Sequence, residues 1–151
     1  MSYTISKDSV SGGKVFNGLV TLKDLNSEPT FTWMATGYNA YQPNQNTIGS
    51  LSLKLNHYSL VVFLGTWCDD SHDLIPRLAK VLEQANFPST ALTMYGVDRA
   101  KTTTNGEEKK FNVKFVPIFI VMKEGHEIGR ITESVSKSIE DDLLGIIEKD
   151  K

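Results

Sequence analysis

The chain has 151 residues, of which 40% are hydrophobic, and a formal net charge of −2 at pH 7. This length and composition suit one soluble globular domain with a sizeable core. The small net charge, without a long block of one sign, argues against binding to nucleic acid or to an anionic membrane. The apolar run Leu60 to Leu64 is too short to span a bilayer. Because the N-terminus has no apolar signal segment, we expect a cytoplasmic protein.

The N-terminal third predicts two strands and a helix. Residues 13–22 and 31–36 have strand-like composition, and the turn-prone sequence Asn26 to Pro29 separates them. A helix is predicted over residues 44–55, because three apolar residues recur there at helical spacing. These residues are Ile48, Leu51 and Leu55.

The pattern becomes sharper from residue 58 onward. Residues 59–65 form a continuous apolar run rich in β-branched side chains, which is typical of a strand buried on both faces. The next segment predicts an amphipathic helix, with Pro76 inside it expected to produce a kink. Its apolar face consists of Leu74, Leu78, Val81, Leu82 and Ala85. A second buried strand is predicted over residues 91–98.

The last third predicts a loop, a hairpin and a final helix. Residues 99–108 are polar and predict a loop that leads to a short helix near Lys109. Strands are predicted over residues 115–122 and 126–131, and the short turn between them requires them to be antiparallel. The final helix has an apolar face made of Ile139, Leu143, Ile146 and Ile147, and we expect Ser134 or Ser136 to cap it. The element order predicts an α/β fold with a mixed sheet covered by helices.

The chain has one cysteine, Cys68, where the first buried strand meets the amphipathic helix. One cysteine excludes an internal disulfide framework. A helix N-terminus favours the reactive thiolate, since its backbone N–H groups and dipole attract negative charge. The Ser71 hydroxyl can donate a hydrogen bond to the sulfur, and a protonated His72 would add to this effect. Three nearby carboxylates oppose the thiolate, so we expect moderate reactivity. They belong to Asp69, Asp70 and Asp73.

Simpler interpretations exist for the same residues. Cys68 can be a small buried hydrophobic residue, and Ser71 can be an ordinary first-turn helix residue. His72 and Cys68 are four residues apart and could supply two metal ligands, but no third ligand cluster is visible. An iron–sulfur cluster of the kind held by monothiol glutaredoxins needs two chains, and Trp67 does not resemble that site. We therefore expect no cofactor.

The sequence resembles the thioredoxin superfamily over residues 56–148. The resemblance rests on the junction LVVFLGTWC, on Pro76 eight residues after Cys68, and on the segment FVPIFIVMKEGHEIGRI. The motif GTWC-x-D-S is similar to that of bacterial thioredoxin-like proteins that carry serine at this position. The resemblance implies a thioredoxin-like three-layer sandwich, with a mixed central sheet flanked by helices. It also implies a single domain over residues 1–151, with a core at 43–151 and an N-terminal extension at 1–42.

The same resemblance implies the roles of the site residues. Cys68 is the expected nucleophile, and Ser71 stands in place of the resolving cysteine. Val62 occupies the position where thioredoxins keep a buried acid. Pro117 is expected to be a cis proline that faces the active cysteine. The residues expected to contact the substrate are Trp67, Asp69, Asp70, Val116 and Pro117.

One thiol can attack a disulfide and form a mixed disulfide, but it cannot resolve that species alone. The sequence therefore predicts a monothiol thiol–disulfide oxidoreductase or isomerase, in which Cys68 forms mixed disulfides with a protein or a low-molecular-weight thiol. Release requires a glutathione-like thiol, a second protein or another substrate cysteine. The alternative is a non-catalytic module that binds a peptide or protein partner in the groove at Trp67 and Pro117.

Overall fold

The computed structural model describes residues 2–150, which build one mixed sheet of six strands. In chain order the strands are β1 (Tyr3–Lys7), β2 (Lys14–Val20), β3 (Ser59–Leu64), β4 (Leu92–Gly96), β5 (Ile118–Lys123) and β6 (His126–Thr132). Their order across the sheet is β1-β2-β4-β3-β5-β6. Strands β3 and β4 are parallel, and each of the other neighbouring pairs is antiparallel. The N-terminal extension therefore supplies two strands to the same sheet.

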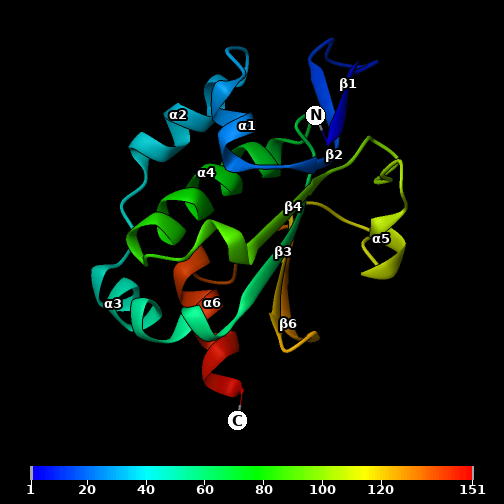
Figure 1. Cartoon of the computed structure of the whole chain (residues 1–151). Coiled ribbons are helices and arrows are strands. Elements are labelled where there is room, and N and C mark those ends of the chain that lie inside the picture. Colours follow the sequence, from blue (N-terminus) through cyan, green and yellow to red (C-terminus); the bar gives the residue numbers. More distant parts are fainter. Residues whose placement is uncertain (1, 151) are drawn as a thin grey trace.

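Helices lie on both faces of this sheet, which gives the predicted three layers (Figure 1). The helical elements are α1 (Leu22–Ser27), α2 (Thr32–Ala40), α3 (Gln45–Lys54), the 3₁₀ turn η1 (Leu55–His57), α4 (Asp69–Gln84), the 3₁₀ turn η2 (Ser89–Ala91), α5 (Glu107–Lys110) and α6 (Ile139–Lys149). The short α5 lies on the opposite side of the sheet from the other α-helices. Within residues 2–150, every helix is too short or too polar to cross a membrane.

Alternate residues of β3 enter two separate cores. Leu60, Val62 and Leu64 belong to the larger core, which lies between the sheet and the main helical layer. Phe63 belongs to the smaller core on the other face, and the partly buried Val61 packs against that core. Since successive side chains of a strand point to opposite faces, this double burial explains the continuous apolar run of the sequence.

Helix α4 has the predicted amphipathic face, and Pro76 lies inside it. Proline has no N–H, so the helix cannot form the usual bond to the carbonyl of His72. Helix α2 packs against α4 at this point. A Cβ on Gly37 of α2 would lie 2.5 Å from Cγ of Pro76, so the glycine permits this close approach.

The strand predicted over residues 31–36 is wrong, because this segment begins helix α2. Phe31 and Met34 are both buried and lie three residues apart, which is the spacing of one helical face. Trp33 stacks on His72 of α4. Packing against α4 therefore overrides the strand-like local composition.

The other predicted elements are present with small shifts in their ends. Residues 13–22 contain β2, and residues 44–55 contain α3, whose first turn is capped by the Asn44 side chain. The strand predicted to end at Asp98 ends at Gly96. The short helix near Lys109 and the antiparallel pair β5–β6 are confirmed.

The predicted cap of the final helix is wrong by a few residues. Ser138 caps α6, and its hydroxyl accepts a hydrogen bond of 3.0 Å from the Asp141 N–H. The Asp142 carboxylate accepts backbone hydrogen bonds from Ser136 and Lys137. These two residues are therefore held in the turn before the helix, and Ser134 lies before that turn.

Replacing Ser138 with alanine is expected to lower the free energy of unfolding by about 1 kcal/mol, since the helix loses its cap. Ser136→Ala is the matched control, because its exposed side chain lies outside the helix. We expect the control to stay within about 0.5 kcal/mol of the parent chain in urea unfolding. Equal losses for both variants would contradict the assignment of the cap.

Candidate functional site

The antiparallel pairing of β3 with β5 brings the candidate site together. Phe63 near the end of β3 lies opposite Ile118 at the start of β5. The segment after β3 therefore meets the segment before β5 at one edge of the sheet. As a result, Cys68 lies beside the Val116–Pro117 peptide bond, which is cis.

Cys68 is half-buried and occupies the N-cap position of α4. Its thiol donates a hydrogen bond to the Val116 carbonyl, with 3.6 Å between sulfur and oxygen. Its backbone N–H donates to the Gly65 carbonyl at 3.0 Å, which closes a turn. The sulfur thus has a fixed position at a helix N-terminus, where negative charge is favoured.

Ser71 has a different partner from the predicted one. It is fully buried, and its hydroxyl accepts a hydrogen bond of 3.1 Å from the Gly65 N–H. Within residues 2–150, the hydrogen bond of the Cys68 thiol goes to Val116 and not to this hydroxyl. Ser71 therefore holds the loop before the cysteine, and the predicted contact with the sulfur is not formed.

Trp67 is half-buried, and its ring is held at its edge and over its face. The indole N–H donates to the Val97 carbonyl at 2.8 Å. The guanidinium of Arg99 lies 5.0 Å from the ring centroid, and the ammonium of Lys101 lies 5.8 Å from it. Cations at these distances are attracted to the ring, so this pair helps to fix the position of Trp67 beside Cys68.

Arg99 is held by a buried carboxylate of the N-terminal extension. Its Nε and Nη2 atoms donate to the two oxygens of Asp8 at 2.6 and 2.9 Å. Ser11 also donates to Asp8, through its N–H and its hydroxyl. Hydrogen bonds from Arg99 and Ser11 hold the pKa of Asp8 far below its usual range. The hydrogen bond to Asp8 raises the pKa of Arg99, and the charges of Asp69 and a Cys68 thiolate raise it further.

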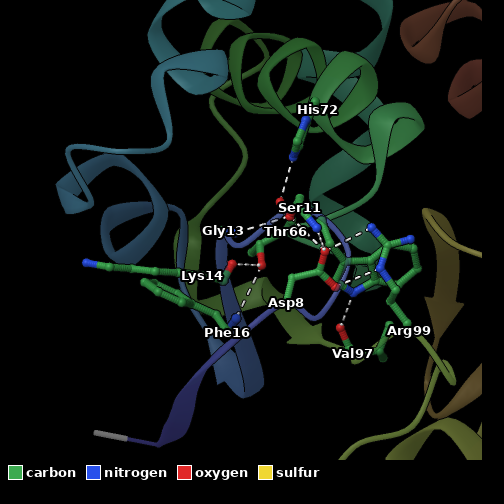
Figure 2. Close-up of polar contacts among 10 residues, drawn as sticks. Asp8, Ser11, Gly13, Lys14, Phe16, Thr66, His72, Val97 and Arg99 are labelled. Carbon is green, nitrogen blue, oxygen red and sulfur yellow. Dashed lines mark hydrogen bonds and ion pairs between the residues drawn. The ribbon is translucent and has the colours of Figure 1, made fainter.

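Thr66 connects the loop of Trp67 and Cys68 to strand β2 (Figure 2). Its hydroxyl donates to the Lys14 carbonyl at 2.7 Å and accepts from the Phe16 N–H at 3.2 Å. Its backbone carbonyl lies 2.6 Å from Nε2 of His72, which must therefore donate. This contact holds the His72 ring at the Thr66 carbonyl, whereas the hydrogen bond of the Cys68 thiol goes to Val116.

The predicted acidic residues lie in the first turns of α4. Asp69 and Asp70 are exposed, and Asp73 forms an ion pair of 3.0 Å with Arg77. Among the described residues, no group of three histidine, cysteine, aspartate or glutamate side chains is placed to hold a metal ion.

The segment before β5 lies on the other side of Cys68. Val116 and Pro117 are buried, and the Val116 N–H donates to no protein acceptor within residues 2–150. Phe115 exposes 52% of its surface, although it is a large aromatic residue. An unpaired backbone N–H beside an exposed ring is suited to contact with an extended peptide.

Sequence reasoning missed several residues of this site. Asp8, Thr66 and Arg99 come from separate parts of the chain and meet only in the folded sheet. Phe115 alone had a local signal, since an aromatic residue directly precedes the Val116–Pro117 pair.

Comparison with known proteins places the region around this site in one family. The family model described as Thioredoxin matches residues 45–147. Thioredoxin AMT13 from Alternaria alternata is 28% identical over 85 residues, which cover 55% of this chain and 67% of that protein. The match to the family model begins after β2, so the N-terminal hairpin, defined as residues 3–20, lies outside it.

A similar fold is found in a solved structure. Protein PA1234 from Pseudomonas aeruginosa, of unknown function, has a TM-score of 0.59 and 14% identity, covering 85% of this chain and 98% of its own. Mitochondrial thioredoxin 3 from Saccharomyces cerevisiae has a TM-score of 0.43 and 21% identity, covering 74% of this chain and 97% of its own.

Replacing Asp8 with asparagine is expected to destabilise the protein at pH 7 and to have less effect in acid. A carboxylate whose pKa is lowered by folding stabilises the native state above its unfolded pKa of about 3.9. This contribution is lost as the pH falls through the lower native pKa. Urea unfolding of both chains at pH 7 and pH 3 measures the difference.

The control for this prediction is Asp73→Asn, which removes an exposed ion pair with Arg77. Exposed pairs stabilise little, so this variant is expected to resemble the parent at both pH values. A pH-independent effect of Asp8→Asn would contradict the account of its ion pair with Arg99.

Proposed function

This chain belongs to the thioredoxin family, and we propose that it is a monothiol thiol–disulfide exchange protein with Cys68 as its nucleophile. The observation that carries the proposal is the placement of the sulfur. It lies at the N-cap of α4 and 3.6 Å from the Val116 carbonyl, in a half-buried position. A disulfide substrate can thus approach a thiol that is held in place at the start of the helix.

The proposed exchange has two balanced steps. In the first, the Cys68 thiolate attacks one sulfur of a disulfide, forms a mixed disulfide and releases the other sulfur as a thiolate. In the second, the thiolate of a protein or of a glutathione-like molecule attacks the mixed disulfide and releases Cys68. One disulfide bond is broken and one is formed in each step, so the net result is an exchange of partners.

Two positions support a monothiol reaction over a dithiol reaction. Ser71 supplies no second sulfur, and its buried hydroxyl is engaged with the Gly65 N–H. Position 62 is a valine that is fully buried in the larger core. A valine has no carboxylate that could receive a proton. A resolving thiol must therefore come from outside the chain.

The groove beside Cys68 suits an extended protein substrate. The unpaired Val116 N–H can donate to a substrate carbonyl, as strand-like recognition requires. Trp67 forms one wall, and Phe115 provides exposed apolar surface next to Val116. Asp69 and Asp70 are exposed in the adjoining helical turn and are proposed to contact the same substrate.

Cys68 is expected to react with glutathione disulfide and to form a mixed disulfide in the folded protein. The reference is the same chain in urea, where the thiol has no structural environment. At pH 7 the folded chain is expected to react about two- to fivefold faster, since the folded site holds the sulfur in position for attack. Cys68→Ala is the control for adduct specificity.

A folded chain that reacts no faster than the unfolded one, and forms no mixed disulfide, would contradict the exchange function. That result would leave the groove as a peptide-binding site without turnover.

Ser71→Cys is expected to convert the chain to dithiol chemistry. The new thiol lies three residues after Cys68 on the first turn of α4 and can attack the mixed disulfide from within the chain. In an insulin reduction assay with an external reductant, we expect the variant to be faster than the parent chain. Ser71→Ala, which also loses the hydroxyl, is the matched control and is not expected to gain activity.

A folded Ser71→Cys variant without reductase activity would contradict the proposed geometry of the groove.

A further inference from the structure

We propose that the N-terminal hairpin is part of the thiol site and that Thr66 is the positioning residue through which it acts. The inference rests on the proposed exchange function, and it adds a part of the chain that the thioredoxin match does not include. The hairpin contacts the loop between β3 and α4, which carries Trp67 and Cys68.

The Thr66 hydroxyl is attached to β2 both as a hydrogen-bond donor and as a hydrogen-bond acceptor. Only 4% of the residue is exposed. The hydroxyl donates to the Lys14 carbonyl at 2.7 Å and accepts from the Phe16 N–H at 3.2 Å. Figure 2 shows Thr66 between these two residues and His72. The hairpin thus contacts the residue two positions before the nucleophile.

The opposite side of the same loop is attached to α4. His72 donates to the Thr66 carbonyl at 2.6 Å, and Ser71 accepts from the Gly65 N–H at 3.1 Å. The loop is therefore held between the active helix and the hairpin. Loss of the Thr66 hydroxyl would free one side of it and leave two backbone groups of β2 without this partner.

A second anchor holds the hairpin on the side of Trp67. Asp8 follows β1 and binds Arg99, whose guanidinium covers the Trp67 ring. The sheet also accommodates the hairpin closely, since a Cβ on Gly96 would lie 2.0 Å from the backbone oxygen of Phe16. The hairpin is therefore linked to Trp67 through Arg99, and it contacts Thr66 directly.

This attachment matters for exchange because attack on a disulfide has a strict geometry. The attacking sulfur must approach along the sulfur–sulfur bond, and a small displacement of a reacting group lowers the rate strongly. The direction of the Cys68 sulfur depends on the backbone of the loop. Loss of a positioning residue slows the reaction of the thiolate itself. The alkaline plateau of the pH–rate profile is therefore lowered.

The test compares Thr66→Val with Thr66→Ser, since only serine keeps the hydroxyl. The rate of Cys68 with the neutral probe 4,4′-dithiodipyridine is measured over pH in chains shown to be folded by circular dichroism. We expect Thr66→Val to lower the plateau about tenfold and Thr66→Ser to stay within about twofold of the parent. Thr47→Val is the control, because it removes a similarly buried hydroxyl on α3, and its plateau is expected to be unchanged.

The outcomes separate this inference from the proposed function. If the parent chain does not react with the probe, the exchange function is wrong. If the parent reacts and Thr66→Val keeps its plateau, only the role of the hairpin is overturned. Should Thr66→Val not fold, Asp8→Asn tests the second anchor. If the plateau of Asp8→Asn is at least about twofold lower than that of the parent, the proposal is supported, and if it is unchanged the proposal is overturned.

Discussion

The site depends on the register between β3 and β5. Pairing of Phe63 with Ile118 in antiparallel strands brings the end of one strand to the start of the other. The helix N-terminus after β3 then faces the cis peptide bond before β5, and the sulfur of Cys68 meets the Val116 carbonyl. A shift by one residue would move the side chains of the shifted strand from one core to the other, so the two cores that flank β3 also fix this meeting point.

The loop that joins β3 to α4 carries Trp67 and Cys68, and the surrounding elements restrain it. Gly65 is bound through Ser71, and Thr66 is bound through His72 and β2. In the proposed reaction the single sulfur forms and exchanges a mixed disulfide, and an external thiol is needed to release it. The serine that replaces the resolving cysteine has a structural function of its own, since it accepts a hydrogen bond from a buried N–H.

The sequence predicted the elements whose signals are local. The apolar run of β3, the amphipathic α4 and the tight turn before His126 depend on periodicity and turn chemistry, and all were found. The segment that begins at Phe31 was misassigned because its strand-like composition is overridden by packing against α4. The Asp8–Arg99 ion pair joins residues 91 positions apart, and only the folded sheet brings them together. The partner of Ser71 was missed because a hydroxyl near a sulfur has more than one possible acceptor or donor.

The most direct test of the central claim is the fate of the mixed disulfide on Cys68. The chain would be treated with glutathione disulfide, freed of excess reagent and followed by intact-protein mass spectrometry. The account predicts one glutathione adduct per chain, stable until an external thiol is added and then lost with release of the free protein. Absence of the adduct, or its loss without any added thiol, would contradict a monothiol exchange site at Cys68.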